Sequence, residues 1–168
     1  LYGRNTTGGA VRIITKKPTE ETEGWVDIAY GEYDTVEMSG KINFALTDKV
    51  FAKFTTFYID QGEGFLHNVT LNKDQWKRDA NGARAQILYA PNDRTEFLFT
   101  AEYSNDETGG AVGANKLSAC CGEDLFVVES GLENTWAGTE LMAISMKATI
   151  DFDNFQMEFI AADRDLEH

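Results

Sequence analysis

The residues most able to do chemistry lie between positions 104 and 140. Carboxylates dominate this stretch, and they are Asp106, Glu107, Glu123, Asp124, Glu129, Glu133 and Glu140. Such a cluster attracts a cation or a basic ligand, although a solvated acidic surface has the same composition. Phe126 and Trp136 can stack on a flat ligand or simply anchor the loop. The candidate ligand contacts are therefore Asp106, Glu107, Phe126 and Trp136.

The cysteines and the histidine carry weaker signals. Cys120 and Cys121 are adjacent, and neighbouring cysteines can close only a strained ring. Two free thiols or partners on other chains are therefore favoured, with a soft metal as the alternative. His67 has no partner at metal-ligand spacing. Since no catalytic triad, zinc-protease motif or phosphate loop is present either, we expect no enzyme activity, no metal and no cofactor.

The elements that position these residues are predicted to be strands. Apolar and polar residues alternate most clearly over 35–46, where Val36, Met38 and Ile42 share one face. The other segments with strand character are 25–30, 50–60, 83–90, 95–103, 140–150 and 155–161. In 50–60 both faces carry aromatic residues, so the alternation does not orient that strand. The sequence predicts an all-β antiparallel meander of about seven strands.

The connections between these segments differ in length. Short turns are expected at 47–49, 91–94 and 151–154, and long connections at 62–79 and 104–139. Transmembrane β-barrels have this asymmetry, whereas the alternation of apolar and polar residues is shared with soluble sandwiches. Four tyrosines near predicted strand ends fit an interfacial aromatic girdle or ordinary core packing. They are Tyr30, Tyr58, Tyr89 and Tyr103.

Charge and hydropathy narrow the function classes. The formal net charge of −13 argues against a nucleic-acid partner, which needs a basic surface. No apolar run reaches the roughly 18 residues that a membrane-spanning helix needs. Neither observation argues against a membrane crossed by alternating strands.

The first eighteen residues, LYGRNTTGGAVRIITKKP, combine a glycine-rich loop with a short alternating strand that Pro18 ends. This segment resembles the closing segment of the plug domain in TonB-dependent outer-membrane receptors. Residues 24–61, with GEYDTVE at 31–37 and LTDK at 46–49, resemble the first barrel strands of that family. Residues 81–103 resemble its next hairpin.

The resemblance implies a fold and a function. Residues 1–18 are expected to end a plug, residues 24–163 to begin a 22-stranded transmembrane barrel, and residues 166–168 to be a tag scar. The family resides in the bacterial outer membrane and imports scarce ligands such as iron-siderophores, cobalamin or glycans, with energy from the TonB complex. An iron-siderophore complex is the expected ligand here. Contact with TonB is expected through parts of the parent protein that this chain lacks.

Further expectations follow from the resemblance. Arg4, Arg12 and Lys17 are candidates for ion pairs between plug and barrel, with solvent-exposed charges as the alternative. Outer-membrane lipid is the expected surrounding of the apolar faces. Seven strands are too few to close a barrel, so the chain is expected to self-associate through its sheet edges. The alternative assignment is a soluble antiparallel β-domain that acts as a binding or interaction module.

Overall fold

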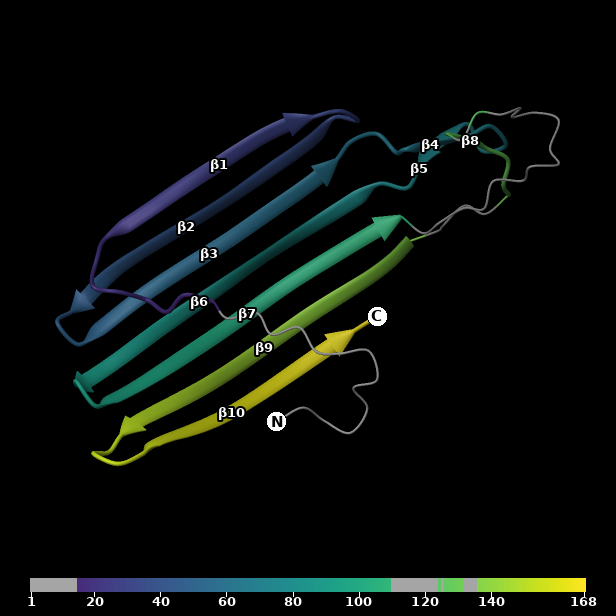
Figure 1. Ribbon diagram of the computed structural model, residues 1–168. Helices are drawn as coiled ribbons and strands as arrows, with labels where there is room; N and C mark the ends of the chain where they lie inside the picture. Colours follow the sequence, from purple (N-terminus) through teal and green to yellow (C-terminus); the bar gives the residue numbers. More distant parts are fainter. Residues whose placement is uncertain (1–14, 110–123, 125, 132–135) are drawn as a thin grey trace.

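Seven strands form one antiparallel sheet in the computed structural model, which describes residues 15–109, 124, 126–131 and 136–168 (Figure 1). The order of the strands in this sheet follows their order along the chain, so the sheet is a meander. The strands are β1 (Glu23–Gly31), β2 (Thr35–Thr47), β3 (Val50–Gln61), β6 (Arg78–Asn92), β7 (Thr95–Gly109), β9 (Trp136–Asp151) and β10 (Gln156–Glu167). The predicted all-β fold and the seven-stranded antiparallel meander are confirmed.

Tight turns close one end of the sheet, between β2 and β3, β6 and β7, and β9 and β10 (Figure 1). Side chains stabilise them locally, as where Asn92 Oδ1 accepts a hydrogen bond of 3.0 Å from the Arg94 N–H. At the opposite end, the β1–β2 turn places Tyr33 at φ 60° and Asp34 at φ 52°. Two consecutive positive φ angles are typical of a type I′ turn, whose twist matches that of the flanking strands.

Three strands are longer than the sequence predicts. β6 begins at Arg78 instead of near position 83, β7 continues to Gly109 instead of ending near 103, and β9 begins at Trp136 instead of near 140. The expected connections 62–79 and 104–139 were therefore wrong at their ends. The added residues are mostly polar, so alternation does not mark them, and the ladders between neighbouring strands hold them in register.

The last strand also extends further. β10 includes Leu166 and Glu167, which pair with Leu141 and Glu140 of β9. Two of the three residues expected to be a tag scar thus take part in the sheet.

A second, small sheet lies beyond the ends of β3 and β6 (Figure 1). It contains β4 (Leu66–Asn68), β5 (Lys73–Gln75) and β8 (Val127–Val128), with β4 and β8 parallel. Leu66 and Val128 form its apolar centre. The fully buried Asn68 amide donates hydrogen bonds to Gln75 Oε1 at 3.0 Å and to the Ser130 carbonyl at 2.9 Å. These interactions fasten the β8 segment to the connection that follows β3.

Within the described residues, no helix has the length and apolar character required to cross a membrane.

Candidate functional site

The main sheet has one apolar face. Because side chains alternate along each strand, the ladder places directly paired residues on the same face. One such row runs through Ile42, Phe54, Ala85, Ala101 and Ile144. The apolar side chains of this row are exposed, with 63% of the surface of Ile144 accessible. The structure thereby orients β3, whose Phe54 and Tyr58 lie on the apolar face.

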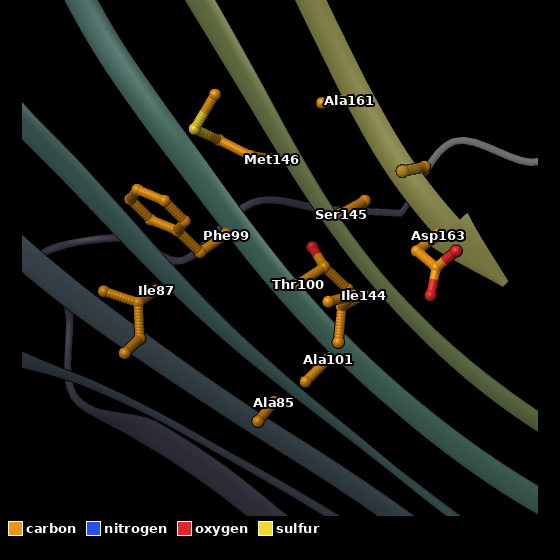
Figure 2. A pocket seen from close by; sticks show the side chains of 11 residues that line it. Ala85, Ile87, Phe99, Thr100, Ala101, Ile144, Ser145, Met146, Ala161 and Asp163 are labelled. Carbon is orange, nitrogen blue, oxygen red and sulfur yellow. The ribbon is translucent and has the colours of Figure 1, made fainter.

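This apolar face carries a shallow hollow of about 600 Å³ (Figure 2). Larger side chains, among them Ile87, Phe99 and Met146, stand beside alanines at positions 85 and 101 (Figure 2). The difference in side-chain size creates the depression. Apolar groups line it almost throughout, with Asp163 of β10 near one side.

Three tyrosines on the apolar face, Tyr30, Tyr58 and Tyr103, fall along a sloping line. The ladder row that contains Tyr30 on β1 reaches Asp60 on β3 and Glu107 on β7. On β3, two strands away from Tyr30, Tyr58 lies two residues before this row. On β7, four strands away, Tyr103 lies four residues before it. With about 3.3 Å per residue along a strand and about 4.8 Å between strands, this slope corresponds to a tilt of roughly 35°.

Polar residues end the apolar zone beyond this line. Asp60, Asp79 and Glu107 are direct ladder neighbours on β3, β6 and β7. At the other boundary Tyr89 stacks on Phe97, with ring centroids 6.1 Å apart. The apolar zone is therefore a band whose boundary at Tyr30, Tyr58 and Tyr103 crosses the sheet obliquely, with carboxylates beyond that boundary and aromatic rings also at the other side.

The opposite face of the sheet, which we call the polar face, carries paired charges together with exposed apolar residues such as Trp25, Phe57 and Ile160. Arg84 donates hydrogen bonds of 3.2 and 2.8 Å to Glu102 on the neighbouring strand. Two further ion pairs between adjacent strands, Lys41–Glu23 at 2.7 Å and Lys147–Glu158 at 2.6 Å, lie on the same face. Cross-strand pairs of opposite charge stabilise a sheet locally.

Residues 15–22, which we call the strap, cross this polar face before the chain enters β1 (Figure 1). Asn43 Oδ1 accepts a hydrogen bond of 3.0 Å from the Thr19 N–H, and its amide donates to the carbonyls of Thr19 at 3.1 Å and Glu21 at 2.5 Å. The Lys53 ammonium group donates to the carbonyl oxygen of Lys16. Asn43 and Lys53 are buried as a consequence.

The predicted ion-pair residues are placed as follows. Lys17 forms an ion pair with Glu96 of β7, so a strap residue reaches across the sheet to a carboxylate on that strand. Arg4 and Arg12 lie outside the described residues, as do Cys120 and Cys121.

The predicted ligand contacts are divided between the two faces. Asp106 lies on the polar face near Arg78, whereas Glu107 lies on the apolar side in the ladder row of Asp79. Phe126 adjoins the small sheet, and Trp136 begins β9 opposite Gly109. Asp106 and Glu107 thus lie on opposite faces of β7 and do not meet at one site.

Sequence reasoning missed a group of aromatic residues around Arg78. Tyr33, Phe65 and Trp76 make edge-to-face contacts, with ring centroids 4.7 Å apart for the first pair and 6.4 Å for the second. The available signal was the pair of glycines at 62 and 64, which precede Phe65 in the sequence, since glycine permits close approach of backbone segments.

The described residues offer no metal centre, because they contain no group of three or more histidine, cysteine, aspartate or glutamate side chains arranged to hold an ion. His67 lies on β4, and its Nδ1 is 2.8 Å from Asp74 Oδ1.

No protein-family model matches the chain, and no solved structure is significantly similar to it.

Proposed function

We propose that this chain belongs to an outer-membrane receptor that imports a scarce ligand, specifically an iron-siderophore complex, with energy from the TonB complex. In this proposal the sheet is part of a closed 22-stranded barrel, and residues 1–18, whose last four lie in the strap, end a plug that occupies its lumen. The resemblance of residues 1–18, 24–61 and 81–103 to that family gives the specific assignment. The structure contributes the physical support.

One observation carries the membrane part of the proposal, namely the oblique apolar band with its sloping line of Tyr30, Tyr58 and Tyr103. Strands of transmembrane barrels tilt by about 35–45°, so a band parallel to the membrane must cross their ladder obliquely. A sheet that packs against a protein core has no need for such a slope. The tilt of roughly 35° derived from the tyrosines falls within the range for barrels.

The strap supports the plug assignment. It lies on the polar face, which would line the lumen, and it is held there by hydrogen bonds from Asn43 and Lys53. The longer connections, from β3 to β6 and from β7 to β9, both leave the end opposite the tight turns (Figure 1). Outer-membrane barrels have short periplasmic turns and longer outer loops.

Spin labels on neighbouring residues test the membrane part. In a variant with Cys120→Ser and Cys121→Ser, single cysteines at Phe99 and Thr100 place labels on opposite faces of β7. In lipid bilayers, the label at position 99 is expected to be relaxed by oxygen dissolved in the lipid, and the label at 100 to be shielded from it. A label at 99 that responds mainly to a water-soluble relaxant would favour the soluble β-domain.

Uptake by the whole receptor tests the transport part. Deletion of the gene in its host is expected to abolish uptake of one iron-siderophore complex, and inactivation of TonB is expected to have the same effect. If neither deletion changes uptake of any iron chelate, cobalamin or glycan, the transport assignment is wrong even where the membrane part holds.

A further inference from the structure

A second hollow lies on the polar face, at the end of the sheet that carries the long connections. It encloses about 410 Å³, and its lining residues are Phe65, Leu66, Trp76, Arg78, Thr108 and Phe126. Phe65 and Trp76 are each 40% exposed, and Phe126 is 58% exposed. Three large aromatic side chains thus remain accessible around one concave surface, the usual composition of a small-molecule site.

Glycines fix the walls of this aromatic hollow. A Cβ atom on Gly64 would lie 2.1 Å from the Gln75 carbonyl oxygen, and a Cβ on Gly109 would lie 2.5 Å from the Trp76 Cα. Trp76 itself has φ 64°, an uncommon conformation for a bulky residue. Residues held in sparsely populated conformations by their surroundings occur preferentially at functional sites. The close backbone approach keeps the Trp76 ring beside Phe65.

Among the described residues that line the aromatic hollow, Arg78 alone carries a formal charge. Its guanidinium group is about half exposed and lies 3.4 Å from Asp106, longer than a good charge-assisted hydrogen bond. The same carboxylate also accepts a hydrogen bond of 2.7 Å from the Thr108 hydroxyl. Arg78 therefore keeps donor capacity for a planar anion, which it can bind in a bidentate manner.

We propose that the aromatic hollow binds a planar aromatic ring that carries a carboxylate or a phenolate. The ring packs among Phe65, Trp76 and Phe126, and its anionic group binds Arg78. A sugar would need more hydrogen-bonding partners than this mostly apolar lining provides, and an organic cation would be repelled by the guanidinium group. As the ligand class of an uptake receptor this inference rests on the proposed function, although binding itself can be measured without transport.

Three naphthalene derivatives that differ in charge test the proposal. Binding of 2-naphthoate, 2-naphthylmethanol and 2-naphthylmethylamine to the purified protein in detergent micelles is measured by calorimetry. We expect saturable binding in the order naphthoate, alcohol, amine. Arg78→Gln should weaken naphthoate binding about tenfold and leave the alcohol unchanged, because it removes a charge-assisted contact. Arg94→Gln, at the tight-turn end of the sheet, serves as the matched control and should change neither.

Two further variants keep the test decisive. Arg78→Lys should retain an intermediate affinity for naphthoate, and Asp106→Asn should increase it several-fold because a competing carboxylate is removed. The circular-dichroism spectrum of each variant reports whether the sheet is intact. The proposal is overturned if wild-type protein binds no naphthoate, or if folded Arg78→Gln and Arg94→Gln bind it equally. If either result is found for a receptor that does transport its ligand, the proposed function stands and the aromatic hollow is not a binding site. If naphthoate binds as expected but uptake and membrane insertion are absent, the hollow is a binding site and the proposed function is wrong.

Discussion

The two faces of the main sheet are built by the same strands, and they reverse the distribution of burial seen in water-soluble sheets. Asn43 is 1% exposed and Gln86 is 3% exposed, whereas their chain neighbours Ile42 and Ile87 are 48% and 45% exposed. A soluble antiparallel sheet covers its apolar face and leaves the polar face to water. Here the strap covers part of the polar face, at Asn43 and Lys53, and the apolar face is left to its surroundings.

The two faces differ in the interactions they require, because only the buried polar groups need hydrogen-bond partners in defined positions. Buried polar groups are costly unless they are hydrogen-bonded, and the strap meets this need at Asn43 and Lys53. The apolar face requires only contact with something apolar, without defined partners. A fluid hydrocarbon phase satisfies the second requirement and not the first.

Arginine on the apolar face should have the largest effect. Phe99→Arg places a charge between the apolar ladder neighbours Ile87 and Met146. It should lower the free energy of unfolding in lipid vesicles by about 2–4 kcal/mol, the cost of arginine near the bilayer midplane. Thr100→Arg, one residue along and on the polar face, is the matched control with a much smaller effect. If urea titrations show equal losses of unfolding free energy for the two variants, the two faces do not differ in their tolerance of a charge.

Loss of the strap anchor should rank second. Asn43→Ala removes the acceptor of the Thr19 N–H and the donor to two strap carbonyls. Buried groups left unsatisfied cost about 1–3 kcal/mol, so the Thr19 amide should exchange its hydrogen about tenfold faster or more. Asn92→Ala, in an exposed turn, is the control. Unchanged protection of Thr19 would mean that the strap is not held by Asn43.

Much of the main sheet could be predicted from the sequence, because alternation marks a strand wherever one face is apolar. The seven strands and the shared face of Val36, Met38 and Ile42 follow from this pattern. The start of β6 at Arg78 does not, since its first residues are polar and depend on pairing with β7. The orientation of β3, with aromatic residues on both faces, required its neighbours.

The candidate sites depend still more on long-range contacts. The aromatic hollow joins Phe65, Trp76 and Phe126, which lie on separate segments. Phe65 and Trp76 meet because β4 pairs with β5, and Phe126 joins them because β8 pairs with β4. Such short strands carry too few residues to show a period. Cross-strand ion pairs also depend on register, which the composition of a single strand does not determine.

A cross-strand ion pair on the polar face should contribute less than the strap anchor. Arg84→Met removes the contacts with Glu102 while keeping an unbranched side chain of similar reach. Both partners are about one-third exposed, so solvent screening limits the loss of stability to about 1 kcal/mol. Arg94→Met is the control, since its ion pair with Asp153 is largely exposed. A loss larger than that of Asn43→Ala in the same urea titration would contradict this ranking.

The ion pair between Lys17 and Glu96 should have the smallest effect, although it joins the strap to β7. Its side chains are 43% and 26% exposed, and exposed pairs contribute about 0.2–1 kcal/mol. A double-mutant cycle with Lys17→Ala and Glu96→Ala measures the coupling free energy, which should decrease further as salt is raised. If the coupling instead exceeds the effect of Asn43→Ala and resists salt, the strap is held mainly by charge. Electrostatic attraction, and not hydrogen bonding, would then hold the strap on the polar face. The proposed contrast between directed hydrogen bonds on one face and undirected apolar contact on the other would then be wrong.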